Sequence, residues 1–354
     1  MPTSASIHPP EDILARLTSA DADVKLKALR EVKNQIIGNR TKKLYYLKLG
    51  AVPAVASVLG SAADSSLLVQ SAAAIGSFAC GFDAGVRAVL DAGAFPHLLR
   101  LISNPDDKVV DAGARSLKMI YQSKLAPKYD FLQEKNMEFL ISLLNSENEN
   151  VTGLGASVIT HSCETSVEQK ALCDAGVLKK LINHLDGSLS QRDASLESLA
   201  TIIKNNPEAV SKFVGDECGR ALSALTELTK DRYPRTSLLA CICLIVIRNT
   251  SPCYLQDVGI KTKLIVILLE LLDDSGLVGD EASFALSRLI AEKEDLQKLA
   301  FEVDAVDKLC NHLQRGPLSD KRFQGILLSL ADLCSNLESC RSKLLSLQVL
   351  NLIT

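Results

Sequence analysis

The sequence contains no tryptophan, and aromatic residues make up only 4% of its 354 residues. Aromatic side chains are enriched in β-strands, whereas Ala and Leu are strong helix formers. Hydrophobic residues nevertheless reach 47%, with Ala and Leu abundant among them. This composition favours packed helices over a sheet.

Long apolar segments are also missing. The longest run, residues 238–247, is about half of the ~20 residues that a helix needs to cross a bilayer. Residues 1–10 lack both the basic start and the apolar run of a secretory signal. We therefore expect no membrane insertion and predict a short disordered tail over residues 1–10.

Ten cysteines are present, but none forms a Cys-x-x-Cys pair and their spacing is irregular. This usage favours reduced thiols in the cytoplasm or nucleus over a disulfide framework. His161 lies close in sequence to Cys163 and Cys173, yet this spacing does not match a zinc motif. The sequence predicts no metal site and no cofactor.

Motifs of catalytic sites are absent as well. The chain has no nucleophile elbow, no phosphate-binding glycine loop and no metal-binding helix motif. His161 and Cys163 are two residues apart, so on a helix they point to different faces. We expect a protein that is not an enzyme. The net charge of −3 and the few aromatic residues also argue against nucleic-acid binding.

Two residue series run through the chain with one period of about 42 residues, which lies in the range of armadillo and HEAT helical repeats. The first series is apolar and predicts the core of one helix per repeat: Ile75, Leu117, Ile159, Leu199, Ile242, Leu286 and Leu330. The second consists of residues that tolerate a turn before a helix: Gly50, Gly93, Asn136, Gly176, Gly215, Gly259 and Asp304.

The residues around Ile75 show how one repeat is built. Leu68, Ala72, Ile75 and Ala79 are spaced so that they share one stripe of a helix. Before this helix stands Gly50-Ala51-Val52-Pro53, in which the glycine can take a positive φ and the proline suits a first helical turn. The sequence predicts that in every repeat such a glycine turn precedes one helix, and that the helix with the core stripe follows it.

This arrangement resembles the armadillo repeat, in which two antiparallel helices follow a shorter one, and HEAT repeats are the alternative. The resemblance implies an all-α, right-handed superhelical armadillo-repeat solenoid of about seven to eight repeats over residues 11–354. The chain ends in an apolar run at 350–354, whereas a terminal repeat needs a polar outer face. We therefore expect the last repeat to be incomplete.

Three segments resemble one armadillo family more closely. Residues 32–39, 49–53 and 74–79 are similar to the N-terminal part of armadillo subunits of the CTLH (GID) ubiquitin-ligase assembly. The resemblance implies a non-catalytic scaffold or adaptor that supports substrate recruitment for ubiquitin-dependent degradation. Its partners would be other ligase subunits, a scaffold and a substrate receptor, in the cytoplasm and nucleus.

In armadillo arrays the residue two positions after the core residue faces a concave groove. Transferred by this resemblance, the candidate partner-binding positions are Ser77, Met119, His161, Thr201, Leu244, Arg288 and Asp332. The groove would be chemically mixed, which suits a folded partner or one particular segment.

Two other armadillo functions remain as alternatives. Nuclear-import and cargo adaptors carry Trp in the groove, and the corresponding positions here are Ala73, Arg115, Ser157, Glu197, Ala240, Phe284 and Leu328. Signalling proteins of the class bind acidic tails with grooves rich in Lys and Arg, whereas the seven candidate positions include only Arg288.

Charge is distributed unevenly along the chain. Residues 21–48 carry eight basic and three acidic side chains, and residues 270–304 carry ten acidic and three basic ones. These are either solvated helix faces or, at each end of the array, docking sites for partners of opposite charge.

Overall fold

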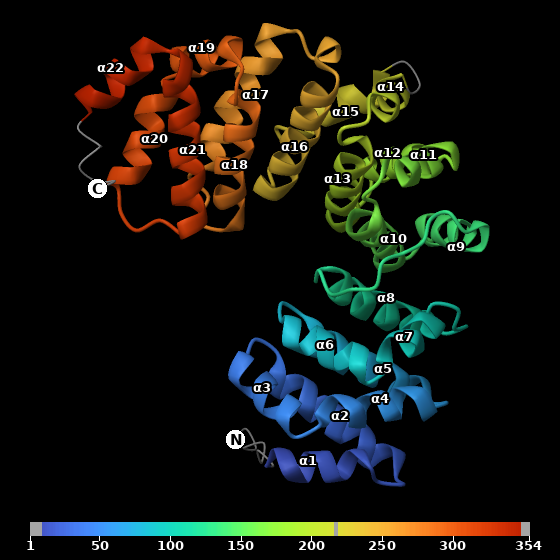
Figure 1. The fold of residues 1–354 in the computed structure, drawn as a ribbon. Helices are drawn as coiled ribbons and strands as arrows, with labels where there is room; N and C mark the ends of the chain where they lie inside the picture. The colour runs from blue at the N-terminus through green and yellow to red at the C-terminus, as the bar shows by residue number, and fades with distance from the viewer. Residues whose placement is uncertain (1–8, 216–218, 348–354) are drawn as a thin grey trace. The chain divides into compact units, whose positions relative to one another are not determined.

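The structure is a computed structural model that describes residues 9–215 and 219–347. The chain divides into two compact units, with unit 1 ending at Cys163 and unit 2 beginning at Glu164, and each is described by itself. All regular elements in the described ranges are helical (Figure 1). The all-α class predicted from the sequence is therefore confirmed. Most of the tail predicted at 1–10 and the residues of the chain end, 348–354, lie outside the described residues.

Unit 1 alternates short helices with longer ones. Its elements are α1 (Pro10–Leu17), α2 (Ala22–Ile36), α3 (Arg40–Lys48), α4 (Ala51–Ser61), α5 (Ser65–Ala79), α6 (Asp83–Asp91), α7 (Ala94–Leu101), α8 (Asp107–Tyr121), α9 (Glu134–Leu144) and α10 (Glu149–Ser162). The long helices α2, α5, α8 and α10 pack side by side in this order. Two complete three-helix repeats, α3–α5 and α6–α8, have the order predicted from the sequence.

Unit 2 follows the same plan. Its elements are α11 (Ser166–Asp174), α12 (Val177–Asn183) with η1 (His184–Asp186), α13 (Leu189–Ile203), α14 (Pro207–Val214), α15 (Arg220–Leu228), α16 (Pro234–Thr250), η3 (Pro252–Tyr254), α17 (Val258–Leu271), α18 (Leu277–Ile290), α19 (Glu294–Glu302), α20 (Ala305–Gln314), α21 (Asp320–Asn336) and α22 (Glu338–Ser346). The long helices α13, α16, α18 and α21 again pack in sequence.

The predicted turn residues take a left-handed conformation in four repeats. Gly50, Gly93, Gly176 and Asp304 have φ values of 78°, 66°, 74° and 58°, and each directly precedes a helix. The prediction is wrong at three other positions, where no left-handed residue occurs: Asn136 lies inside α9, Gly215 has a φ of −76° and Gly259 lies inside α17. In the repeat of Gly215 this role belongs to Gly219, with a φ of 79°.

The left-handed positions give a paired stability prediction. Replacing Gly93 by alanine is expected to destabilise unit 1 by about 1 kcal/mol, because an L side chain is strained at positive φ. Asp304→Gly is expected to stabilise unit 2 slightly, because the same strain is relieved there. Urea denaturation of both variants measures the two effects. A destabilising Asp304→Gly substitution would contradict the strain argument.

Hydrogen bonds between successive long helices fix their register. The hydroxyl of Ser116 on α8 donates to the carbonyl oxygen of Ala72 on α5, with a distance of 2.7 Å. In unit 2, Ser329 on α21 donates in the same way to Ser283 on α18, at 3.3 Å. Both serines are buried and immediately precede the core leucine of their helix. Small side chains at these places allow the helices to approach closely.

Buried glutamines join short helices to long ones in unit 2. Gln169 on α11 donates to the carbonyl oxygens of Thr201 and Lys204, at the end of α13. Gln297 on α19 is fully buried and donates to the carbonyl oxygen of Ile290, the last residue of α18. The last carbonyls of a helix have no partner within the helix. These amides therefore satisfy acceptors that burial would otherwise leave without a hydrogen bond.

Among the described residues no single helix is long and apolar enough to cross a membrane. Taken together, α3 and α4 reach the length and composition of a span, but they are bent by 77° where they meet.

Candidate functional site

A cavity on the surface of unit 1 brings together two of the predicted groove residues. Ser77 on α5 and Met119 on α8 both line it, and its volume is about 630 Å³. Its wall extends to α2 through Lys33. Three successive long helices therefore contribute to one cavity. That this cavity binds a partner stays a prediction.

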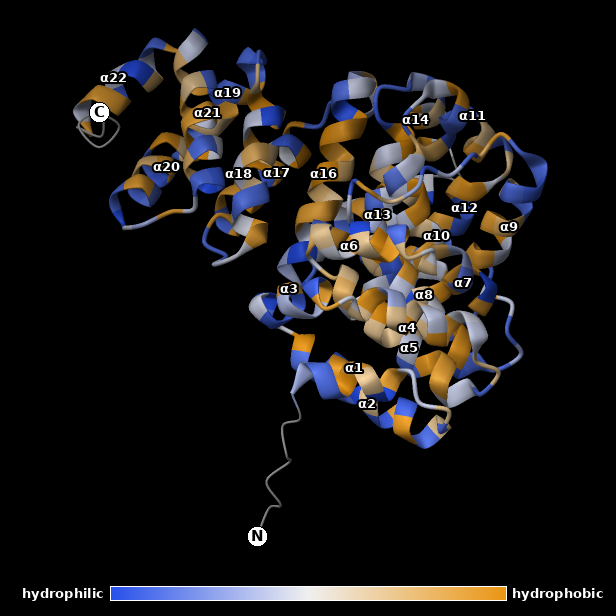
Figure 2. Cartoon of the chain, turned by 60° about the horizontal axis from the view of Figure 1, so that its bottom comes forward, coloured by the Kyte–Doolittle hydropathy of each residue, from blue (hydrophilic) through white to orange (hydrophobic). Residues whose placement is uncertain are grey.

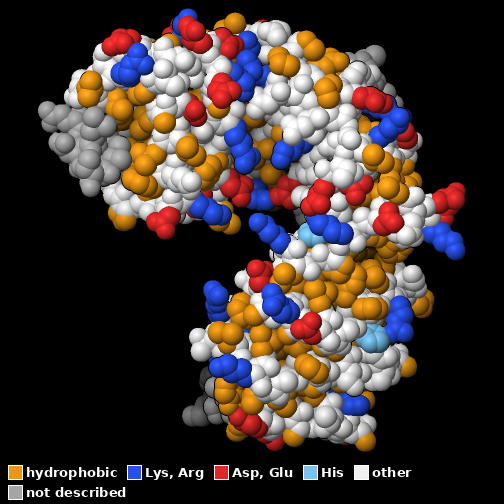
Figure 3. Space-filling model, in the orientation of Figure 1, with side chains coloured by type: hydrophobic (Ala, Val, Ile, Leu, Met, Phe, Trp, Pro, Cys, Tyr) orange, Lys and Arg blue, Asp and Glu red, His pale blue; other side chains and the backbone are white. Residues whose placement is uncertain are grey.

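The floor of this cavity is apolar and its rim is polar. Val69, Ala73 and Ala112 lie among the lining residues, together with the half-buried Met119. Figure 3 shows that hydrophobic side chains are exposed over much of the visible face of unit 1, interrupted by single charges. A partner segment with one or more apolar side chains could bury them here.

Charges of both signs stand at the rim. Lys33 Nζ donates to Gln70 Oε1 at 3.1 Å. Asp111 forms an ion pair with Arg115 at 2.9 Å and accepts a hydrogen bond from Asn150 on α10 at 2.7 Å. Ala73 and Arg115, which the resemblance aligns with the Trp positions of import adaptors, both line the cavity. The lining contains no aromatic side chain on which a lysine could stack, which disfavours lysine-rich peptides.

His161 is held by the unit's own structure. Its Nε2 is 2.9 Å from the carbonyl oxygen of Ala126, and its ring packs edge-on against Tyr121 with centroids 5.6 Å apart. It does not line the cavity of Ser77 and Met119. Within the described residues no three His, Cys, Asp or Glu side chains gather as metal ligands.

In unit 2 the structure corrects the position of Leu244. Its side chain is only 1% exposed, whereas Ile242, the predicted core residue, is half-buried. The thiol of Cys243 donates to the carbonyl oxygen of Leu196 on α13 at 3.2 Å. Cys243 therefore donates to the preceding long helix, as Ser116 and Ser329 do. Because each of those serines directly precedes the core leucine of its helix, the core residue of α16 is Leu244. The position two residues later is Val246, which is half-buried.

The other three predicted residues of unit 2 do not form one site. Thr201 donates through Oγ1 to the carbonyl oxygen of Glu197 at 2.9 Å. Asp332 on α21 accepts a hydrogen bond from Ser287 Oγ at 2.8 Å. Arg288 is exposed and lines a second cavity of about 240 Å³, which neither Thr201 nor Asp332 lines.

This second cavity, the α16–α18 pocket, is formed by α16, α18 and the two residues that follow α13. It is lined by Lys204, Asn205, Ile242, Ile245, Val246, Asn249, Thr250, Ala285 and Arg288. Sequence reasoning missed all of these as site residues except Arg288. Ile242, Val246 and Asn249 share one stripe of α16, which the corrected register would have identified.

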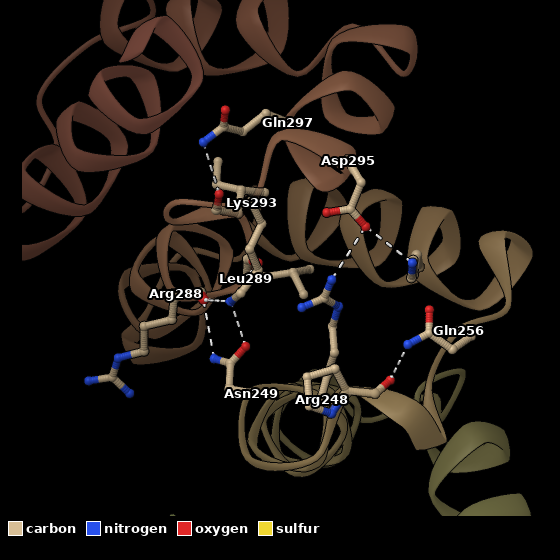
Figure 4. Close-up of polar contacts among 11 residues, drawn as sticks. Arg248, Asn249, Gln256, Arg288, Leu289, Lys293, Asp295 and Gln297 are labelled. Carbon is tan, nitrogen blue, oxygen red and sulfur yellow. Dashed lines mark hydrogen bonds and ion pairs between the residues drawn. The ribbon is translucent and has the colours of Figure 1, made fainter. Parts of the chain in front are cut away.

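Figure 4 shows the polar contacts behind this pocket. Lys293 Nζ donates to Asn249 Oδ1 at 2.6 Å, and Asn249 Nδ2 donates to the carbonyl oxygen of Arg288 at 3.3 Å. Asp295 accepts from Arg248 at 3.3 Å and from Lys261 at 3.1 Å. Burial, followed by the neighbouring positive charge of Arg248, lowers the pKa of Lys293. The network fixes the Asn249 amide and the end of α18.

Several relatives found by sequence comparison carry the name armadillo repeat-containing protein 8. The protein from Mus musculus is 24% identical over 296 residues, covering 82% of this chain and 44% of the relative. Those from Pongo abelii and Xenopus laevis are each 25% identical, covering 82% of this chain and 44% and 41% of the relatives. The chain thus spans less than half the length of these curated relatives. No protein-family profile matches it.

Solved structures show the same fold. An engineered protein aligns with a TM-score of 0.61 and 20% identity, covering 96% of this chain and 82% of that one. A designed armadillo repeat protein in complex with the peptide (KR)4 aligns with a TM-score of 0.54 and 20% identity, covering 68% of this chain and all of that one. The armadillo fold predicted from the sequence is confirmed.

Proposed function

Because this chain is an armadillo-repeat protein similar to armadillo repeat-containing protein 8, we propose that it is a non-catalytic scaffold or adaptor subunit of a CTLH/GID-type ubiquitin ligase. It binds other subunits, among them a scaffold and a substrate receptor, in the cytoplasm and nucleus. Its role is to hold receptor and catalytic subunits near each other, which raises the effective concentration of the reacting groups at the substrate.

The observation that carries this proposal is the similarity over 82% of the chain to a protein of that name. Support also comes from the resemblance of residues 32–39 and 74–79 to ligase subunits of the armadillo class. Both segments lie in unit 1, and residues 76, 77 and 33 belong to its 630 Å³ cavity. We therefore propose this cavity as the contact surface for a ligase partner.

Affinity purification of the tagged chain from cells tests both statements. We expect CTLH-type subunits to copurify with the unmodified chain. Ser77→Arg is expected to reduce their recovery about tenfold, because a long charged side chain would occupy the cavity, and a tenfold change corresponds to about 1.4 kcal/mol. The measurement is quantitative mass spectrometry of the recovered subunits.

Ser66→Arg is the matched control, because Ser66 is exposed on the same helix and does not line the cavity. It should leave recovery unchanged. If the unmodified chain recovers no ligase subunit, the proposed function is wrong. If Ser77→Arg and Ser66→Arg recover equal amounts, the function stands but the contact lies elsewhere.

A further inference from the structure

The α16–α18 pocket has a basic rim with no acidic residue in its lining. Lys204 and Arg288 are both exposed, and neither side chain has a hydrogen-bond or ion-pair partner among the described residues. Figure 4 shows the Arg288 guanidinium extending away from the contacts that hold its own carbonyl oxygen. Most other arginines of unit 2 are paired, as Arg235 is with Glu197 and Arg322 with Asp280. The pocket therefore combines two cations that form no ion pair with any residue that the structure describes.

Between these cations lies an apolar floor. Ile242 and Val246 are half-buried on the exposed stripe of α16, and Ala285 on α18 completes the floor. The volume of about 240 Å³ exceeds the roughly 150 Å³ of an apolar cavity that binds benzene in another protein. One leucine-sized side chain fits into such a space.

Several nearby carboxylates already have partners, whereas Glu292 and Asp332 keep their negative charges close to Lys293. Asp295 is bound by Arg248 and Lys261, and Asp332 accepts a hydrogen bond from Ser287. Glu197 and Glu281 lie on either side of Arg235, which pairs with both. Asp295, Glu197 and Glu281 are therefore paired with cations of their own and do not neutralise the rim of the pocket.

We propose that the α16–α18 pocket binds an acidic segment of a partner protein, with one apolar side chain on the floor and flanking carboxylates at Lys204 and Arg288. Cationic side chains attract carboxylates, and the apolar floor selects a peptide over a small inorganic anion. Asn205 and Thr250 at the edge supply further polar groups for the segment. This site lies in unit 2 and does not depend on the proposed ligase function.

Fluorescence anisotropy with purified protein tests the proposal. The probe is a short labelled peptide with a central leucine flanked on both sides by glutamates. We expect saturable binding that weakens about fivefold in Lys204→Gln and in Arg288→Gln, the size of one partly exposed ion pair of about 1 kcal/mol. Arg288→Glu is expected to weaken it further, because a like charge then repels the peptide.

Two peptide changes separate the contributions of charge and floor. Replacing the glutamates by glutamines should remove the effect of the arginine and lysine substitutions. Replacing the leucine by glycine should weaken binding at least tenfold, a change of about 1.4 kcal/mol, since burial of an aliphatic side chain stabilises a complex by at least this amount. Lys263→Gln is the control variant, because Lys263 is exposed on α17 outside the pocket.

Several outcomes would overturn the proposal. The absence of saturable binding is one, and equal weakening by Lys263→Gln and Arg288→Gln is another. If inorganic polyphosphate binds as tightly as the peptide and the leucine makes no difference, the site is a general anion site. A far-ultraviolet circular dichroism spectrum of each variant confirms that loss of binding does not reflect unfolding.

Discussion

Leu244→Ala is expected to destabilise unit 2 by about 2–5 kcal/mol, whereas Ile242→Ala should have a much smaller effect. Leu244 is 1% exposed and packs in the core, so its truncation leaves a cavity. Ile242 lies at the surface of the α16–α18 pocket and loses far less buried area. Urea denaturation followed by circular dichroism measures both changes.

The two substitutions are two residues apart on one helix, and both remove aliphatic carbon from a β- or γ-branched side chain. Helix propensity alone would favour alanine at both sites. If Ile242→Ala were the more destabilising variant, the register derived from the Cys243–Leu196 hydrogen bond would be wrong, and Leu244 would return to the groove.

Gly325→Leu is expected to lower the stability of unit 2 by about 3 kcal/mol or more, and Gly325→Ala by about 1–3 kcal/mol. A Cβ atom at Gly325 would lie 2.6 Å from the Cβ and 3.0 Å from the backbone carbon of Ser283. The hydroxyl of Ser283 could rotate away, but its backbone could not. The helices α18 and α21 would have to separate, which breaks the Ser329–Ser283 hydrogen bond.

Gly259→Ala is the matched control for Gly325→Ala. Gly259 lies near the start of α17, is exposed, and has only an Asp257 carboxylate oxygen near its added Cβ, at 3.1 Å. Alanine should stabilise this helix by up to about 1 kcal/mol. Equal melting temperatures for Gly325→Ala and the unmodified chain would show that the α18–α21 interface tolerates a wider separation.

Most of the fold could be predicted because the apolar period survives in six of the seven core positions. Ile75, Leu117 and Ile159 are fully buried in unit 1, and Leu199, Leu286 and Leu330 are at most 3% exposed in unit 2. The exception is α16, which is largely orange in Figure 2 because its own apolar residues occupy all of its faces. Between residues 236 and 248 only Ile242 and Val246 are not buried. Periodicity cannot identify the core face of such a helix.

The predicted turn residues failed where a repeat departs from the three-helix plan. No short α-helix directly precedes α9, and only the single turn η3 precedes α17. The chain therefore enters these helices without the left-handed turn that Asn136 and Gly259 were expected to provide. Two glycines, Gly215 and Gly219, precede α15, and the sequence alone could not show that Gly219 is the one with the left-handed conformation.

The charge of the candidate binding surfaces was harder to predict than the fold, because charged side chains form ion pairs with residues of neighbouring repeats. The excess of acidic residues in 270–304 predicted an electronegative region. In the structure Asp280 binds Arg322, 42 residues away, and Asp295 binds Lys261, 34 residues away. The same region contributes Arg288 to a basic pocket. Counting charges along the chain cannot show which of them remain available.

The buried amide of Gln297 has a consequence for how such chains can be divided. Gln297 belongs to the following repeat, yet its side chain donates the hydrogen bond that the carbonyl oxygen of Ile290, the last residue of α18, accepts. In turn, Asn336 Nδ2 donates to Gln297 Oε1 at 3.0 Å. A cut between α18 and α19 would separate an acceptor from its donor. The transferable building block at this point is therefore a repeat together with the short helix that follows it, which sets where segments can be exchanged between related proteins.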